Sequence, residues 1–298
     1  MQIEKANAAL DQIIDADAKV EKLADGFMFT EGPVWVRREG CLLFSDIPNG
    51  RIHRWSQSDG LSVYREPSFK SNGLTLDRQG RLVACEHVGR RVSRTGADGS
   101  VEALATNHEG KRLNSPNDVV VKSDGSIYFT DPPYGLMNDR IGAFAPRELD
   151  MAGVWRISPD GTQLTLVAEE LQAPNGLAFT PDESRLYVDD SSQGTIHVYD
   201  VRADGSLGTG SVFAKLEGDG PGVPDGMKVD QQGNVYCTGP GGVFVVDPNG
   251  TLLGRLKIPG HTANLAWGDD DWHTLYLANG DAIARLRMKI PGIPVGQA

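Results

Sequence analysis

The stretch that decides the fold is NDVVVKSDGSIYFTD, residues 117–131. It begins with a polar residue, continues as an apolar run, turns at a polar segment with glycine and ends in a second apolar run. This pattern is typical of a β-hairpin whose tight turn needs a positive φ. Five further segments follow the same plan, beginning at Glu31, Asn72, Asn175, Asp225 and Asn264. Successive starts lie 39 to 58 residues apart, and strand repeats of about 40–50 residues indicate propeller blades.

A third strand and a weaker fourth strand usually follow each hairpin, so the sequence predicts an all-β fold: a six-bladed β-propeller with four-stranded antiparallel blades, built as a single domain from residues 1–298. Segment 18–26, AKVEKLADG, has no hairpin partner nearby. We expect it to supply the outer strand of the last blade, because a closed ring leaves no open sheet edge. An α/β fold is the alternative, but no helical pattern of ten or more residues follows residue 20.

The N-terminal extension, residues 1–18, has a different pattern. Its apolar residues are spaced as on one face of a helix, so residues 3–15 predict a short amphipathic helix. The face consists of Ile3, Leu10, Ile13 and Ile14.

Composition narrows the class of protein. The net charge is −11 without a block of like charges, which argues against a nucleic-acid partner. The longest apolar runs are too short for a membrane span, and the N-terminus lacks the apolar run of a signal peptide. We therefore expect a cytoplasmic protein, or a periplasmic one if a leader has been removed, acting as a monomer or homodimer.

Cysteines and tryptophans fit a structural role. Three cysteines without a CxxC spacing argue against a disulfide framework or a structural zinc site, so we interpret them as structural thiols. Four tryptophans in predicted strands are expected to pack between blades, whereas Trp272, in the polar loop GDDDWHT, is expected at the rim or exposed. The three cysteines are Cys41, Cys85 and Cys237, and the four tryptophans are Trp35, Trp55, Trp155 and Trp267.

The first residue of each repeat suggests a site. In a propeller the first strand of each blade lines the central channel, so these six residues should meet near one mouth. All six carry side-chain oxygen donors: Glu31, Asn72, Asn117, Asn175, Asp225 and Asn264. Burying converging carboxylates and amides costs desolvation free energy unless a cation lies between them. Oxygen ligands favour Ca²⁺, Mg²⁺ or Mn²⁺ as that cation. The alternative is that polar residues start strands because turns favour them, which applies most to Asn72 and Asn264.

The ends of the second strands supply further candidates. Glu86, His87, Asp131 and Tyr134 should face the same mouth or its rim, where they would bind hydroxyl groups of a ligand or a second cation. Alternatively, Asp131 caps the DPPYG turn and His87 is a satisfied rim residue.

The insertion at 134–153 explains the longest spacing between repeats. Long loops over a site are often lids. Met137, Phe144 and Leu149 would then seal the pocket from water. A surface excursion or an oligomer contact is the alternative interpretation of this loop.

Five stretches resemble the gluconolactonase/regucalcin-like family of calcium-dependent lactonases, most closely in the style of bacterial gluconolactonases. They occur in the expected order and read FTEGPVW (29–35), RLNSPNDVVV (112–121), YFTDPPYG (128–135), APNGLAF (173–179) and PDGMKVD (224–230). The resemblance implies a six-bladed propeller with one metal at the channel mouth. It implies Glu31, Asn175 and Asp225 as metal ligands, and Asn117 as a ligand or a substrate contact. It also gives Asp225 a second role as general base or water-orienter.

The implied activity is metal-dependent hydrolysis of a sugar lactone, such as gluconolactone, to the aldonic acid. Ca²⁺ is the expected cofactor, with Mg²⁺, Mn²⁺ or Zn²⁺ as substitutes, and a water activated by the metal charge is an alternative to Asp225 as the base. Some animal members carry a sugar-binding arginine where this chain has Ser115, and Arg112 is the candidate replacement. The alternatives are hydrolysis of aromatic lactones or organophosphates, and a calcium-binding propeller without enzymatic activity.

Overall fold

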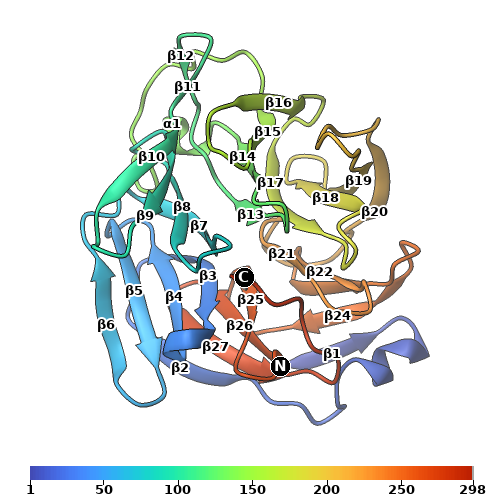
Figure 1. Cartoon of the computed structure of the whole chain (residues 1–298). Coiled ribbons are helices and arrows are strands. Elements are labelled where there is room, and N and C mark those ends of the chain that lie inside the picture. Colours follow the sequence, from blue (N-terminus) through green and yellow to red (C-terminus); the bar gives the residue numbers. More distant parts are fainter. Residues whose placement is uncertain (297–298) are drawn as a thin grey trace.

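The computed structural model describes residues 1–296 and forms a six-bladed β-propeller (Figure 1). Blade 1 contains β3 (Thr30–Val36), β4 (Cys41–Asp46), β5 (Arg51–Ser56) and β6 (Gly60–Arg65). Blade 2 contains β7 (Ser71–Leu76), β8 (Leu82–Glu86), β9 (Arg91–Thr95) and β10 (Val101–Ala105). Blade 3 contains β13 (Val119–Val121), β14 (Ile127–Asp131), β15 (Gly153–Ile157) and β16 (Leu164–Ala168).

The second half of the ring repeats this plan. Blade 4 contains β17 (Pro174–Phe179), β18 (Arg185–Asp190), β19 (Thr195–Asp200) and β20 (Ser211–Lys215). Blade 5 contains β21 (Met227–Val229), β22 (Val235–Gly239), β23 (Gly242–Val246) and β24 (Leu252–Lys257). Blade 6 contains β25 (Thr262–Gly268), β26 (Thr274–Asn279), β27 (Ala282–Arg287) and β2 (Glu21–Asp25). The predicted all-β class and blade architecture are confirmed.

The first strand of every blade is the innermost. β3 contacts β7, and the contacts continue through β13, β17, β21 and β25 back to β3. The inner strands are almost entirely buried, whereas the outer strand β6 is exposed along most of its length. This order brings the start of each repeat to the central channel.

Closure of the ring occurs as the sequence predicted. β2 pairs antiparallel with β27, and Glu21 lies opposite Arg285. The outer strand of the last blade therefore comes from the beginning of the chain, as the blue strand beside the red blade in Figure 1 shows. The edge of β27 that would otherwise be open is paired.

The predicted N-terminal helix over residues 3–15 is largely wrong. β1 (Gln2–Lys5) is a strand that adds to the outer edge of β24, so blade 5 has five strands, and only η1 (Ala8–Gln12) is a 3₁₀ helix. An open sheet edge offers backbone partners that a reading of side-chain periodicity does not consider. The prediction that these residues form one apolar face is partly confirmed, because Leu10, Ile13 and Ile14 are buried against the propeller.

Aromatic rings join neighbouring blades. Trp35 of blade 1 stacks on Tyr276 of blade 6 with ring centroids 5.2 Å apart, and Trp267 packs edge-on against Tyr236 of blade 5. Trp272 is buried rather than exposed as predicted. The C-terminal segment covers it, because the Gly292 N–H donates to the Trp272 carbonyl.

The remaining short elements lie outside the blades. They are η2 (Arg37–Glu39), the hairpin of β11 (Asn107–His108) and β12 (Lys111–Arg112), and α1 (Tyr134–Met137). All three cysteines are free and buried, as expected for structural thiols. No helix within residues 1–296 is both long and apolar enough to cross a bilayer.

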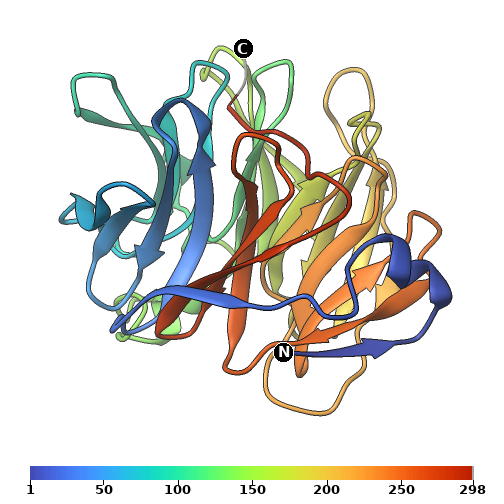
Figure 2. The same cartoon turned by 90° about the horizontal axis from the view of Figure 1, so that it is seen from below.

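The C-terminal segment, as far as residue 296, runs near the channel axis (Figure 1) and toward one face of the propeller (Figure 2). It is held to blade 5 because the Gln231 N–H donates to the Pro291 carbonyl. Ile293 and Val295 then pack on the cores between the blades. This segment occupies the end of the channel toward which the inner strands run.

Candidate metal and substrate site

The six residues that begin the repeats form a contiguous ring, called the mouth ring below: Glu31, Asn72, Asn117, Asn175, Asp225 and Asn264. Its neighbours approach closely because glycine follows the ring residue in several blades. A Cβ on Gly32 would lie 2.0 Å from the Asn72 carbonyl oxygen, and one on Gly176 would lie 2.0 Å from that of Asp225. Only glycine permits this approach.

Hydrogen bonds continue the ring between other blades. The Gly73 N–H donates to the Asn117 carbonyl at 2.7 Å. Asn264 Nδ2 donates to Glu31 Oε2 at 2.9 Å, which joins blade 6 to blade 1. The Thr130 hydroxyl of blade 3 donates to the Asn175 carbonyl of blade 4 at 2.7 Å. The tertiary structure thus connects residues that lie far apart in the sequence.

Hydroxyl groups on the second strands hold the ring backbone. The Ser45 hydroxyl donates to the Asn72 carbonyl at 2.8 Å. Ser191 donates to the Pro224 carbonyl at 2.6 Å and accepts from Asn175 Nδ2 at 3.0 Å. Because the Asn175 amide nitrogen is engaged in this way, its oxygen is directed elsewhere and is available as a ligand.

Glu31 is a buried carboxyl group with few compensating donors. Its Oε2 accepts from the Gly32 N–H and from Asn264 Nδ2. The pKa of Glu31 is raised to about 7, because burial and the charge of Asp118 outweigh these two hydrogen bonds and Lys228. Without a cation, the charged form of this side chain is therefore poorly stabilised.

Asp225 lies in the same electrostatic environment. Burial raises its pKa well above the usual range, and the charges of Glu31, Asp189 and Asp118 add to that effect. A hydrogen bond from Asn175 acts in the opposite direction. Two carboxyls whose pKa values are both raised are a favourable arrangement for a divalent cation, whose charge would lower both pKa values.

Two acidic residues near the ring were missed in the sequence. Asp118 occupies the position after the ring residue where four other blades have glycine, a difference that could have identified it. Its Oδ1 accepts from the Val119 N–H, and Lys228 Nζ lies 4.0 Å from its Oδ2. Asp189 on β18 is fully buried, and its Oδ2 accepts a hydrogen bond from the Cys237 thiol at 3.6 Å. Nothing in the sequence distinguished its position.

The donor set suits a hard cation. In the described part of the chain, no three His, Cys, Asp or Glu side chains group as a metal site. The predicted set does not require such a group, because it combines two carboxylates with amide oxygens. Several buried oxygens near the ring also have no hydrogen-bond partner among residues 1–296, namely Asn72 Oδ1, Asp118 Oδ2 and Asp189 Oδ1. Unpaired buried oxygens and excess negative charge fit Ca²⁺ or Mg²⁺ better than a soft metal.

Tyr134 and Asp131 border this region. The Tyr134 hydroxyl donates to the Ala173 carbonyl at 3.5 Å, two residues before Asn175. Burial raises the pKa of Tyr134, and the nearby charge of Asp225 contributes, so Tyr134 is a neutral donor beside Asp225. Asp131 Oδ2 accepts from the Asn114 N–H at 2.8 Å, and burial raises the pKa of Asp131 to about 7. Asp131 therefore fixes the loop that leads to Asn117.

Glu86 and Arg112 have partners outside the mouth ring. Glu86 Oε1 accepts from Arg65 at 2.9 Å, and its Oε2 accepts from Arg91 at 2.6 Å. Arg112 is exposed on β12 and donates to the Gly89 carbonyl at 3.2 Å. The Ser115 hydroxyl, at the position where some relatives carry arginine, donates to the Pro132 carbonyl at 2.6 Å. The structure therefore shows no contact between these three side chains and the ring.

The inserted loop is attached to blades 1 and 2. Lys70 Nζ donates to the carbonyls of Arg140 and Gly142 at 3.2 and 3.1 Å, and the Arg140 guanidinium donates to the Met28 carbonyl at 3.0 Å. Met137 and Phe144 are 66% and 70% exposed.

Leu149 differs from the expectation that it helps to seal the pocket. It is buried in the core between blades 2 and 3, where Trp155 and Leu113 offer an apolar environment.

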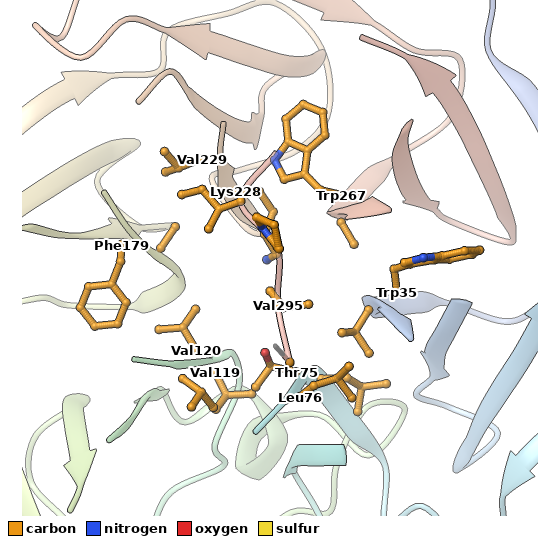
Figure 3. Close-up of a pocket in the computed structure, with 18 of the residues that line it drawn as sticks. Trp35, Thr75, Leu76, Val119, Val120, Phe179, Lys228, Val229, Trp267 and Val295 are labelled. Carbon is orange, nitrogen blue, oxygen red and sulfur yellow. The ribbon is translucent and has the colours of Figure 1, made fainter. Parts of the chain in front are cut away.

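A cavity of about 150 Å³ lies along the channel, at the end away from the mouth ring. Its lining residues follow the ring residues along the inner strands, and most are apolar. Figure 3 shows Val295 of the C-terminal segment among Thr75, Leu76 and Trp267, with Lys228 nearby. The polar chemistry is therefore at the mouth ring, whereas this cavity is the packed end of the channel.

Comparison with known proteins agrees with this architecture. Residues 29–280 match the family model described as the SMP-30/Gluconolactonase/LRE-like region. The gluconolactonase of Zymomonas mobilis is 33% identical over 313 aligned residues, covering 98% of this chain and 87% of that protein. Pentonolactonase XacC of Haloferax volcanii is 32% identical over 263 residues, covering 84% of this chain and 82% of that protein.

A solved structure extends the similarity to three dimensions. XC5397 of Xanthomonas campestris, described as a gluconolactonase, superposes with a TM-score of 0.90 at 36% identity, covering 97% of this chain and 95% of that one. Similarity in sequence and structure over nearly the whole chain shows that this protein belongs to the SMP-30/gluconolactonase/LRE-like family, as the resemblance of its motifs predicted.

Proposed function

We propose that this protein hydrolyses a sugar lactone of the gluconolactone type to the aldonic acid, using one divalent cation at the mouth ring. The observation that carries the proposal is the pair of carboxyls, Glu31 and Asp225: burial raises the pKa of Glu31 to about 7, and burial together with the charge of Glu31 raises the pKa of Asp225. The names of two relatives, gluconolactonase and pentonolactonase, support a sugar-derived lactone as the substrate.

The proposed ligands of the cation are Glu31, Asn175 and Asp225, with Asn117 as a further ligand or a substrate contact. Two carboxylates balance the charge of a dication, and amide oxygens complete a hard-donor set for which Ca²⁺ is the preferred ion. When bound, the cation polarises the lactone carbonyl and stabilises the negative charge that develops on its oxygen.

The protein's own groups handle the water and its proton. Asp225 orients the attacking water and accepts its proton as the bond from the water oxygen to the carbonyl carbon forms. The bond from that carbon to the ring oxygen then breaks, and the ring oxygen receives from Asp225 the proton taken from the water and becomes a hydroxyl. The carboxylic acid product then ionises and releases one proton to solvent. Tyr134 stays protonated because burial raises its pKa, so its hydroxyl is a neutral hydrogen-bond donor beside Asp225. A strained cyclic ester needs no covalent nucleophile.

A proton-release assay with a panel of lactones tests this function. The panel contains D-glucono-δ-lactone, a pentonolactone, an aromatic lactone and an organophosphate ester, each measured with EDTA and after addition of Ca²⁺, Mg²⁺, Mn²⁺ or Zn²⁺. We expect turnover of the sugar lactones to be lost with EDTA and restored by Ca²⁺. Full activity in EDTA would reject the metal-dependent mechanism, and a preference for the aromatic lactone or organophosphate would reject the substrate class. Tight Ca²⁺ binding without any turnover would favour a calcium-binding propeller without enzymatic activity.

A further inference from the structure

His87 connects the inserted loop to the mouth ring. It follows β8 and is 1% exposed. On one side its Nδ1 lies 2.9 Å from the Ile141 carbonyl oxygen, in the inserted loop. On the other side its Nε2 lies 3.4 Å from Asn72 Nδ2, in the mouth ring. One side chain therefore contacts both the loop and the ring.

The loop contact fixes the tautomer of His87. A backbone carbonyl can only accept a hydrogen bond, so Nδ1 must carry the proton. Burial lowers the pKa of His87 to about 4, so the ring is neutral and Nε2 is an acceptor. Asn72 must therefore turn its NH₂ group toward Nε2, because an amide oxygen there would face a lone pair.

In this orientation Asn72 Oδ1 lacks a hydrogen-bond donor. Asn72 is 5% exposed, and its Oδ1 is buried without a hydrogen-bond partner in the described residues. A buried amide oxygen without a donor has lost its hydrogen bonds to water without compensation. The backbone of Asn72 belongs to the ring, since its carbonyl abuts Gly32 and accepts from Ser45. A ligand at the mouth that brings a hydroxyl donor would satisfy this oxygen.

We propose that Asn72 Oδ1 accepts a hydrogen bond from a hydroxyl group of the lactone, and that His87 is the positioning residue that fixes this orientation from the docked inserted loop. The inference rests on the proposed lactonase function and adds a specificity contact to it. The enzyme would therefore discriminate against lactones without hydroxyl groups, because such a lactone leaves Asn72 Oδ1 unpaired. The inserted loop acts on specificity through His87 rather than through its exposed apolar side chains.

The test compares a polyhydroxylated lactone with an unsubstituted one. Rates for D-glucono-δ-lactone and δ-valerolactone are measured for wild type, Asn72→Ala, His87→Phe, His87→Gln and the double variant Asn72→Ala/His87→Phe. His197→Phe is the matched control, because this histidine lies on β19 and contacts Thr195 instead of the ring. Ca²⁺ affinity by calorimetry and the circular dichroism spectrum report on the metal site and on folding.

We expect kcat/KM for gluconolactone to fall about tenfold to hundredfold in Asn72→Ala and His87→Phe, corresponding to one lost hydrogen bond. The rate for δ-valerolactone and the Ca²⁺ affinity should change less than about twofold. His87→Gln, which can offer an acceptor and a donor, should recover part of the loss. The double variant should be no worse than Asn72→Ala, because His87 acts through Asn72.

Equal losses on both lactones, or additive losses in the double variant, would overturn the inference while leaving the lactonase function intact. Unchanged gluconolactone kinetics in His87→Phe would also overturn it. If His87→Phe does not fold, His87→Gln and Asn72→Ala still decide the result through the ratio of the two lactones. Failure of the proposed function looks different, because wild type itself would then hydrolyse neither lactone, and both proposals would fall.

Discussion

At the scale of single residues, the mouth ring is defined by side-chain oxygens that have too few hydrogen-bond donors and positive charges beside them. Burial raises the pKa values of Glu31 and Asp225, the charge of Glu31 raises that of Asp225 further, and Lys228 is the cation that lowers the pKa of Glu31. Asp118 adds a further negative charge where other blades have glycine. This excess of negative charge supports the proposed cation, and the proposed mechanism assigns the water and its proton to Asp225.

Asp225→Asn tests that role. The amide keeps the size and one oxygen ligand but cannot accept a proton, so kcat for gluconolactone should fall by about 10²–10⁴-fold. The measurement is initial rate at saturating Ca²⁺, with occupancy of the metal site confirmed by calorimetry. Asp204→Asn, at an exposed turn, is the control and should retain wild-type rates. Near wild-type turnover in the metal-loaded Asp225→Asn protein would assign the base to another group.

Glu86→Gln separates a structural role from a substrate contact. Both oxygens of Glu86 are occupied by Arg65 and Arg91, and the side chain is fully buried. Loss of this charge should lower the free energy of unfolding by about 3 kcal/mol, with KM for the lactone unchanged. Urea denaturation and steady-state kinetics measure the two quantities. Glu102→Gln, which breaks the exposed ion pair with Arg94, should cost less than about 1 kcal/mol. A raised KM with unchanged stability would instead make Glu86 a substrate contact.

At the scale of elements, each blade relies on its neighbours, and the ring is closed by a strand from the opposite end of the chain. β2 pairs with β27 through a register that begins at Glu21 and Arg285. β1 adds a fifth strand to blade 5. The N-terminal segment therefore covers the outer edges of two blades, which makes it a structural component of the propeller.

A proline in β2 should weaken this closure. Lys22 lies opposite Ala284 in the ladder, and Lys22→Pro would disturb the pairing with β27 and cost about 3 kcal/mol. For a chain of this size the melting temperature should fall by about 5–10 °C. Asp17→Pro, at an exposed position before the strand, is the control and should melt within about 2 °C of wild type. Equal melting temperatures for the two variants would show that β2 contributes little to stability.

At the scale of the whole molecule, the channel has two dissimilar ends. The mouth ring concentrates carboxyl and amide groups, whereas the other end is an apolar cavity into which Val295 packs (Figure 3). This asymmetry directs polar ligands to one face of the propeller. The raised pKa values of the buried carboxyls Glu31 and Asp131 also make the stability of the fold depend on pH.

The metal-free protein should lose stability as the pH rises. The pKa of Glu31 is about 7 in the folded chain against 4.5 for the ordinary group, and the pKa of Asp131 is about 7 against 3.8. Both groups stabilise the fold fully below their unfolded pKa values, and this contribution is lost as the pH rises through about 7. In EDTA we therefore expect the melting temperature to fall on the order of 5 °C between about pH 5 and pH 8.

Added Ca²⁺ should raise the melting temperature more at about pH 8 than at about pH 5, because the cation replaces protons on the ring carboxyls. Differential scanning calorimetry at both pH values measures this. Asp131→Asn should flatten part of the slope in EDTA and keep the Ca²⁺ response. A melting temperature that does not vary with pH in EDTA, or an equal Ca²⁺ effect at both pH values, would contradict the cation site.

The sequence by itself determined the blade count, the closing strand and the residues of the mouth ring. These features are local, because each hairpin contains its own turn residues and apolar strands, and each repeat begins with a polar residue. Periodicity could not identify β1, because that strand forms only where the edge of β24 is available. Trp272 was also misplaced, since its burial depends on the C-terminal segment that covers it.

Only the tertiary structure decided how the side chains are used. Glu86 and Arg112 occupy promising positions in the sequence, yet their partners are arginines and a backbone carbonyl that folding brings beside them. Asp189 becomes part of the ring's electrostatic environment through β18, and His87 contacts Asn72 because the inserted loop holds it there. The physical reason is that strand and turn preferences act along the chain, whereas burial, pKa and hydrogen-bond partners depend on distances between blades.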